Sequence, residues 1–157
     1  MDAVTYVLLH ETTHMVDMFL GLTPQGYYKD SIPNDAHTPV TRGLWASISK
    51  LDAPYHDPIF QRVNFAPNAK TIPVAEAQSL YEALGRTPLV SIYASRGYLE
   101  DLPEFVAWRQ MTRKLDQPYR IEIRDGGQVV FSCEPMKNPL VQNRLGLLER
   151  FDSQGLN

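Results

Sequence analysis

The apolar side chains of residues 2–20 recur with a helical period and cover more than one face of the predicted helix. This stretch contains no glycine or proline, Asp2 is an acceptable N-cap, and Gly21 and Pro24 end it. A helix that is apolar on several sides is typical of a protein interior. We therefore expect the first helix to be central and buried.

A long proline-rich connection follows this helix. Residues 22–73 contain seven prolines, and only residues 40–51 have the pattern of a short helix. Irregular segments of this length are uncommon in compact domains and usually have a function or move. The connection also carries several aromatic side chains, which indicate that it packs against the rest of the domain.

Two more helices are expected in the middle of the chain. Pro73 opens one over residues 74–84, with Gly85 as its C-cap, and residues 88–95 then form a short extended run. The next helix covers about residues 99–115. Because proline lacks a backbone N–H, Pro103 fits only in the first turn, which places the start of this helix near residues 99–101.

The last third of the chain predicts a β-hairpin and a final helix. Residues 119–123 and 128–133 have the composition of strands, and Asp125, Gly126 and Gly127 between them predict a hairpin turn. Asn138 and Pro139 open an amphipathic helix that runs to about Phe151. The whole pattern predicts a single domain over residues 1–157, of the α+β class and predominantly helical.

The composition narrows the classes of partner and site. A chain of 157 residues can form one domain with a hydrophobic core, and a formal net charge of −3 argues against nucleic acid as a partner. No apolar run is long enough to span a membrane, and the first residues lack the pattern of a signal peptide. With Cys133 as the only cysteine, an internal disulfide and most thiolate zinc sites are excluded. The compartment stays open, because a leader can be removed.

The strongest chemical signal is the stretch His10-Glu11-Thr12-Thr13-His14, which has the HExxH spacing of zinc peptidases. On a helix, residues four apart lie one turn apart on the same face, so both imidazoles can reach one metal ion. The motif therefore predicts a Zn²⁺ site with His10 and His14 as ligands and the adjacent Glu11 as general base. The alternative is a pair of histidines satisfied by hydrogen bonds inside a core.

A catalytic zinc site needs a third protein ligand and an open position for water. Asp17 is excluded, since a straight helix cannot wrap three ligands around one ion. His37 and His56 lie in the long connection, where histidine is more often a surface or turn residue than a ligand. Glu100 and Glu104 are better candidates, because one can bind the metal while the other orients a zinc histidine. Taken alone, this pair also fits a solvated acidic helix start.

The segment from residue 92 to residue 105 resembles the second motif of gluzincin metallopeptidases, zincins whose third ligand is a glutamate on a later helix. The pattern is most similar to that of lethal-factor-type and related zinc peptidases. In these, a tyrosine precedes the ligand glutamate by seven residues and a second acid follows it by four, the spacing of Tyr93, Glu100 and Glu104. The resemblance implies that Glu100 is the third ligand and that Glu104 holds a zinc histidine by a hydrogen bond. It also implies that the Tyr93 hydroxyl assists at the oxyanion or leaving group.

The resemblance covers residues 6–17 and 88–108 and not the connection between them. Peptidases of this type have a β-sheet ahead of the HExxH helix, whose edge strand pairs with extended substrate, whereas only nine residues precede His10 here. Either this chain is the C-terminal part of a longer protein or the predicted hairpin substitutes for the sheet. We favour the first interpretation.

Together these features predict a zincin-like α+β domain that hydrolyses peptide bonds in a peptide or protein substrate. One Zn²⁺ is expected on His10, His14 and Glu100, with Glu11 as the general base and Tyr93 as a donor to the oxyanion. An alternative is a non-catalytic, zinc-stabilised interaction domain, which needs the histidines but no base. A third interpretation is a metal-free helical domain with a fortuitous motif. Nothing in the pattern specifies the substrate sequence or the oligomeric state.

Overall fold

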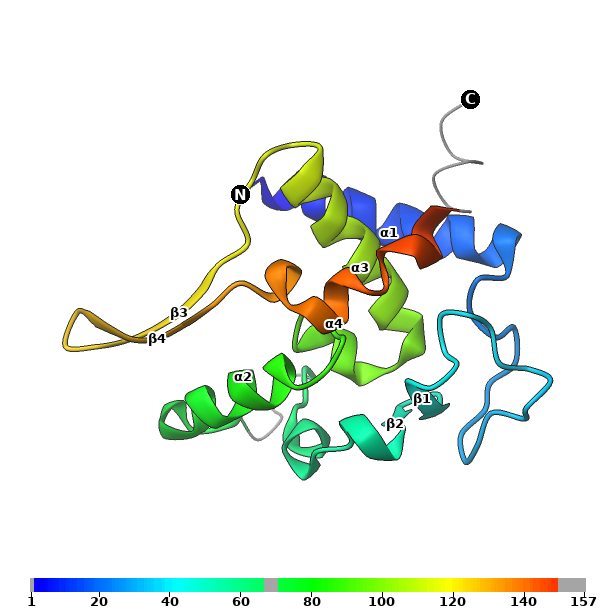
Figure 1. Ribbon diagram of the computed structural model, residues 1–157, viewed down its shortest axis with the longest axis horizontal. Coiled ribbons are helices and arrows are strands. Elements are labelled where there is room, and N and C mark those ends of the chain that lie inside the picture. The colour runs from blue at the N-terminus through cyan, green and yellow to red at the C-terminus, as the bar shows by residue number, and fades with distance from the viewer. Residues whose placement is uncertain (1, 67–70, 150–157) are drawn as a thin grey trace.

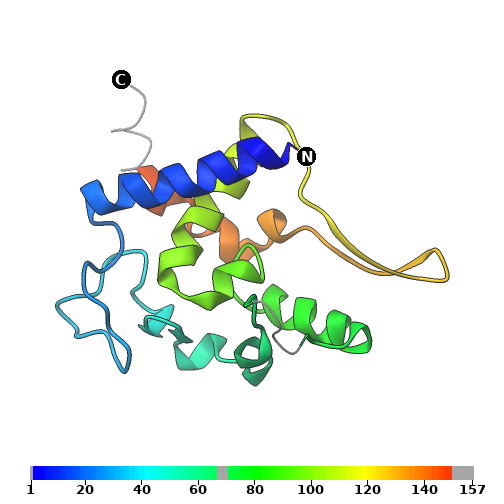
Figure 2. The same ribbon diagram turned by 180° about the vertical axis from the view of Figure 1, so that it is seen from behind.

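The structure is a computed structural model that describes residues 2–66 and 71–149. Four α-helices lie within these ranges, with two small antiparallel sheets and several 3₁₀ turns. Figures 1 and 2 show helix α1 (Ala3–Leu20) lying across helix α3 (Tyr98–Arg113), with helix α2 (Ala77–Gly85) at the other end of the molecule. The predicted class, α+β and predominantly helical, is confirmed.

Helix α1 begins and ends where its sequence predicts. The Asp2 side chain accepts hydrogen bonds from the backbone N–H groups of Val4 and Thr5, which otherwise lack partners at a helix start. At the other end Gly21 adopts the left-handed conformation (φ 60°), and its N–H bonds to the carbonyl oxygen of Asp17.

The predicted burial of α1 is wrong. Its fully buried residues are polar, namely His10, Thr13 and Asp17. Six of its large apolar side chains form a stripe on the outer face, which we call the apolar stripe: Val4, Val7, Leu8, Met15, Met18 and Phe19. Phe19 is 94% exposed. The inner face combines the polar partners of α3 described below with three partly buried side chains that pack against the core, those of Tyr6, Leu9 and Leu20.

The long connection packs as expected, but residues 40–51 form no helix. They contain the antiparallel pair β1 (Trp45–Ser47) and β2 (Lys50–Leu51). Gly43 has a φ of 72°, which interrupts helical geometry, and the Trp45 side chain is completely buried. The apolar pattern of this stretch reflects contacts with the core and not a helical face.

Helix α2 follows a 3₁₀ turn at Val74–Glu76, and Gly85 is its last residue and not the residue beyond it. Residues 88–95 are not extended as predicted. They form bends that lead into a short 3₁₀ helix, η4 (Tyr93–Arg96). Pro88 to Ser91 are all buried, so the apolar pattern of this run reflects its packing in the core.

Helix α3 begins at Tyr98, so Pro103 lies in its second turn and not in the first. The start is fixed by a tertiary contact, because the Tyr98 N–H donates to the carbonyl oxygen of Ile48 (3.2 Å). Gly97 precedes this helix in extended conformation. The helix tolerates Pro103 even though proline removes one backbone hydrogen bond.

The predicted hairpin is confirmed as β3 (Ile121–Asp125) and β4 (Gln128–Cys133), and it projects from the body of the molecule in both views. Gly126 and Gly127 both have positive φ, as a tight hairpin turn requires. The last predicted helix is wrong over residues 143–148. Helix α4 (Pro139–Gln142) is short, and a 3₁₀ helix (Leu145–Leu148) follows because Arg144 turns inward. Phe151 lies outside the described residues.

Helix α3 lies between two apolar clusters. Leu102, Phe105 and Val106 belong to a cluster shared with the end of the chain, and Tyr98 belongs to one shared with the connection and α2. This central position makes α3 the framework of the candidate site. In the ranges that the structure describes, no helix combines the length and apolar character needed to cross a membrane.

Candidate metal centre

Helices α1 and α3 bring together side chains that are about 90 residues apart in the sequence. The inner face of α1 presents His10 and His14, and the first turns of α3 present Glu100 and Glu104. Both pairs have a spacing of four residues, which places the two members one above the other on one face of each helix. The crossing of α1 over α3 then sets the imidazoles against the carboxylates.

Two imidazoles and one carboxylate converge at this crossing. The Nε2 atom of His10 lies 3.2 Å from Oε2 of Glu100 and 3.3 Å from Nε2 of His14. The third edge of this triangle, from His14 Nε2 to Glu100 Oε2, is 3.7 Å. A tetrahedral zinc ion with bonds of about 2.0–2.1 Å separates its ligand atoms by roughly 3.3–3.4 Å. His10, His14 and Glu100 therefore form a group that could hold one metal ion.

Glu104 lies behind this group and has no accessible room for an ion, since only 1% of the residue is exposed. One oxygen is 2.9 Å from Nδ1 of His10 and also accepts a hydrogen bond from the Tyr6 hydroxyl. The other oxygen accepts hydrogen bonds from the Ser91 hydroxyl (2.5 Å) and from Nε1 of Trp108 (3.2 Å). With Nδ1 of His10 held in this way, Nε2 is left to face the other two donor atoms.

His10 and the two glutamates of the site each favour the charged form of the other through hydrogen bonds. Burial alone would lower the pKa of His10, but hydrogen bonds to Glu100 and Glu104 outweigh burial and raise this pKa from 6.5 to about 9. The hydrogen bond from His10 lowers the pKa of the Glu100 carboxyl. In Glu104 burial acts to raise the pKa, yet its hydrogen-bond donors overcome burial and leave the pKa lowered. Both carboxyls are therefore ionised at neutral pH, the form that binds a cation.

Glu11 and Tyr93 differ in how closely they approach the centre. Glu11 follows His10 on α1 and lies on the exposed side of the helix. The ring of Tyr93, on η4, has its centroid 5.7 Å from that of His10. Burial and the charge of Glu100 raise the pKa of Tyr93, so its hydroxyl keeps its proton at neutral pH and can donate a hydrogen bond. The Arg96 guanidinium lies over this ring at 5.5 Å.

The other candidates from the sequence lie outside this group. The Asp17 carboxylate accepts hydrogen bonds from the backbone and the hydroxyl of Thr23, which ends α1 against the connection. His37 is close to the Thr41 hydroxyl (3.4 Å), and His56 lies beside Gln61 (3.1 Å). None of the three belongs to the metal-ligating group found in the described part of the chain.

Sequence reasoning missed three residues that hold Glu104: Tyr6, Ser91 and Trp108. Two of them carried a usable signal, because Tyr6 is four residues before His10 and Trp108 is four residues after Glu104. Such spacing places each on the same helix face as a candidate site residue. Ser91 carried no comparable signal, since its position depends on how residues 88–95 fold against α3.

A scan of the chain against protein-family models found no match. Searches of curated proteins and of solved structures found none either.

Proposed function

We propose that this domain is a zinc-dependent metallopeptidase. The observation that carries the proposal is the triangle of donor atoms from His10, His14 and Glu100, whose edges of 3.2, 3.3 and 3.7 Å suit one ion. Two imidazoles and a carboxylate are a donor set typical of catalytic zinc, which keeps its fourth position open. Glu104 supports the proposal, because zinc-binding histidines usually bond through the second ring nitrogen to a carboxylate or carbonyl.

A bound zinc ion would polarise the peptide carbonyl and lower the pKa of water to about 7. The chain itself would supply the proton transfers. Glu11, adjacent to His10, would accept a proton from the attacking water and return it to the leaving amine. The protonated hydroxyl of Tyr93 would donate a hydrogen bond to the oxyanion that forms during the attack.

The substitution Glu11→Gln tests this assignment. It keeps the size and helix propensity of the side chain but removes the base, so we expect zinc to be retained and peptide hydrolysis to fall by roughly 10²–10⁴-fold. The measurements are zinc content and turnover of a mixed peptide library. Glu82→Gln, an exposed change on α2, is the matched control and should leave turnover intact. Equal turnover in both variants of an active preparation would exclude Glu11 as the base.

The second candidate function is a zinc-stabilised interaction domain without catalysis. The apolar stripe on α1 favours it, because six large apolar side chains on one exposed helix face are typical of a contact surface. The two functions differ in what Glu11→Gln does. A structural site would hold zinc and show no hydrolysis in either the original chain or the variant.

A further inference from the structure

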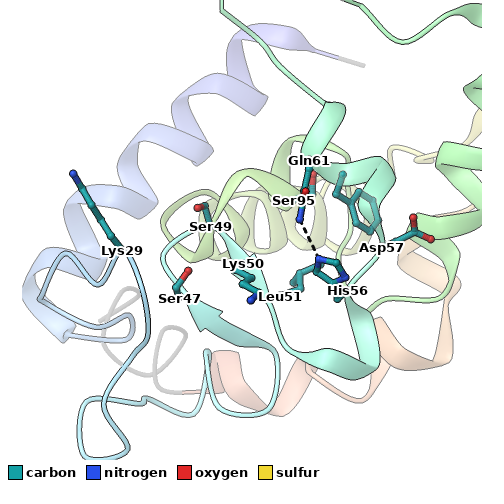
Figure 3. A pocket seen from close by; sticks show the side chains of 10 residues that line it. Lys29, Ser47, Ser49, Lys50, Leu51, His56, Asp57, Gln61 and Ser95 are labelled. Atoms are coloured by element: carbon teal, nitrogen blue, oxygen red, sulfur yellow. Dashed lines mark hydrogen bonds between the residues drawn. The ribbon is translucent and has the colours of Figure 1, made fainter.

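A polar cavity lies at the turn between β1 and β2 (Figure 3). Its volume is about 340 Å³, and its walls carry Ser47, Ser49, Lys50, His56 and Ser95, which together define the serine pocket. Ser95 belongs to η4, as does Tyr93, two residues away. The short helix η4 therefore contributes to the serine pocket and also carries the Tyr93 ring that lies near His10.

The Ser47 hydroxyl is an unused hydrogen-bonding group in this cavity. Ser47 is only 2% exposed, yet within the described residues its hydroxyl makes no side-chain hydrogen bond. Buried hydroxyls nearly always have partners. In the described part of the chain, every side-chain nitrogen or oxygen that is shut off from solvent has a hydrogen-bond partner. The unpaired Ser47 oxygen is therefore accessible, and the pocket that Ser47 lines gives access to it.

Lys50 adds a positive charge on the same side. Ser47 and Lys50 are cross-strand partners at the turn between β1 and β2, and side chains of such partners lie on the same face of a strand pair. In the part of the chain that the structure describes, no carboxylate lies within ion-pair distance of the Lys50 ammonium. Lys29 also borders the pocket, but Figure 3 shows its side chain extending away from the other lining residues. Its ammonium lies 5.5 Å from the centroid of the Tyr27 ring.

The acidic neighbour of the pocket does not neutralise Lys50. The Asp57 carboxylate bonds to Arg86 (3.0 Å) and to the N–H of Ile59 (3.0 Å), so its charge is already compensated. Leu51 and Phe60, both buried, form the apolar part of the lining, and Gln61 lies 3.1 Å from His56. The pocket therefore combines two apolar side chains, the unpaired Ser47 hydroxyl and the ammonium of Lys50.

We propose that the serine pocket binds the carboxylate side chain of an acidic residue of a peptide, with Lys50 and the Ser47 hydroxyl as its partners. Leu51 and Phe60 contact the methylene groups of that side chain, and Lys50 and Ser47 bind its oxygens. Placed polar groups that fix the orientation of a ligand, beside apolar side chains that contact its carbon atoms, are features of ligand sites. This inference does not depend on the metal or on hydrolysis.

The test uses two probes that differ by one charge, the α-amides of N-acetylglutamate and N-acetylglutamine. Each is titrated into the metal-free protein at low salt, and binding is followed by the amide resonances of Ser47, Leu51 and His56 in NMR spectra. We expect the glutamate probe to bind at least about tenfold more tightly, since a hydrogen bond to a charged group is stronger than one to a neutral group. Equal affinities, or shifts confined to other residues, would overturn the proposal.

Two variants assign the partners. Lys50→Met should abolish the preference for glutamate, whereas Lys114→Met, an exposed control with the same change in net charge, should keep it. Ser47→Ala should weaken binding of the glutamate probe by roughly tenfold. A preference that survives Lys50→Met, or an unchanged affinity in folded Ser47→Ala, contradicts the proposed roles. Lys50 is exposed, so its variant tests the proposal even if Ser47→Ala fails to fold.

Discussion

At the scale of single residues, Glu104 is the most enclosed carboxylate of the candidate metal centre, and its contacts define what Glu100 can do. The two carboxylate oxygens of Glu104 are hydrogen-bonded to the side chains of four residues: Tyr6, His10, Ser91 and Trp108. The Glu100 side chain is 25% exposed, and among the described residues its carboxylate lies within ion-pair distance of His10 and His14. Two glutamates one turn apart thus have different surroundings, and the less enclosed one is free to bind an ion.

Zinc affinity should separate these two glutamates. Glu100→Gln removes the proposed third ligand, so we expect zinc affinity to fall by more than the roughly 10–100-fold that an orienting contact typically contributes. Glu104→Gln keeps the size of the side chain and should lose zinc affinity within that range. Competition with a chelator measures both, with circular dichroism as the check on folding. A greater loss of zinc in folded Glu104→Gln would reverse the two roles.

The raised pKa of His10 makes the stability of the metal-free protein depend on pH. A group whose pKa rises on folding, here from 6.5 to about 9, favours the folded state fully below pH 6.5. That contribution is lost as the pH rises through about 9. We therefore expect urea unfolding to show stability decreasing between these two values. His37→Asn should keep the decrease and His10→Asn should lose it.

Zinc binding should have the opposite dependence on pH, because a ligand imidazole must be neutral. Its apparent affinity should rise with pH over the same interval, and the binding should release a proton.

Stability that is independent of pH in the metal-free protein would show that His10 carries no raised pKa.

At the scale of elements, the turn between β1 and β2 holds the start of α3, and Gly97 is the point of closest approach. A Cβ added at Gly97 would overlap the carbonyl oxygen of Ile48, the same oxygen that accepts from the Tyr98 N–H. Backbone atoms cannot move aside as a flexible side chain can. The position of Glu100, three residues later, therefore depends on glycine here.

Gly97→Ala should lower the free energy of unfolding by about 1–3 kcal/mol or more, the usual range for overpacking. It should also weaken zinc binding, because Glu100 moves with the start of α3. Gly85→Ala is the control, since no described atom lies within 4 Å of its added Cβ and alanine favours the helical end of α2. Urea unfolding of both variants measures the difference. Equal stabilities of the two variants would mean that the turn between β1 and β2 moves to accommodate the added methyl group at little cost in free energy.

The sequence predicts well those elements whose ends are determined by residues at the ends themselves. Asp2 and Gly21 define the ends of α1 through their own capping groups, and Gly126 and Gly127 define the hairpin through their positive φ. Residues 40–51 and 143–148 were predicted wrongly because long-range contacts decide them. Trp45 enters the core and Arg144 turns towards α3, and neither contact leaves a periodic signal in the sequence.

In the candidate metal centre, too, the sequence predicts what depends on one helix and misses what depends on contacts between distant segments. The spacing of His10 and His14 follows from one helix, so the HExxH pattern predicts their convergence. Spacing cannot distinguish Glu100 from Glu104, since both lie on one face of α3. Their difference arises from burial against Ser91 and Tyr6, and it is visible only once the helices cross.

At the scale of the whole molecule, one buried ion pair connects three distant segments. Asp101 is 0% exposed and accepts two hydrogen bonds from Arg144 (2.9 and 2.7 Å) and one from Nε1 of Trp45 (3.1 Å). Arg144 also donates to the carbonyl oxygen of Pro88 (2.8 Å). The pair thereby joins the connection, the start of α3 and the end of the described chain.

Arg144→Met should destabilise the protein by about 3–5 kcal/mol, because it leaves the Asp101 carboxylate buried without its counter-ion. Adding Asp101→Asn to this variant should recover part of the loss, since it removes the unpaired charge. Arg113→Met, at an exposed arginine, should change stability by less than about 0.5 kcal/mol. Thermal unfolding of the three variants measures these differences. No recovery in the double variant would show that packing, and not charge, explains the loss.

The crossing of α1 over α3 also bears on the order in which the chain folds. The contacts of His10 with Glu100 and Glu104 close loops of 90 and 94 residues, and long loops lose more chain entropy on closing than short ones. Contacts of such separation tend to form late. An ion that meets the unfolded chain finds no assembled set of His10, His14 and Glu100. We therefore expect a bound metal to slow unfolding more than it speeds folding, because contacts that form late stabilise the folded state more than the transition state.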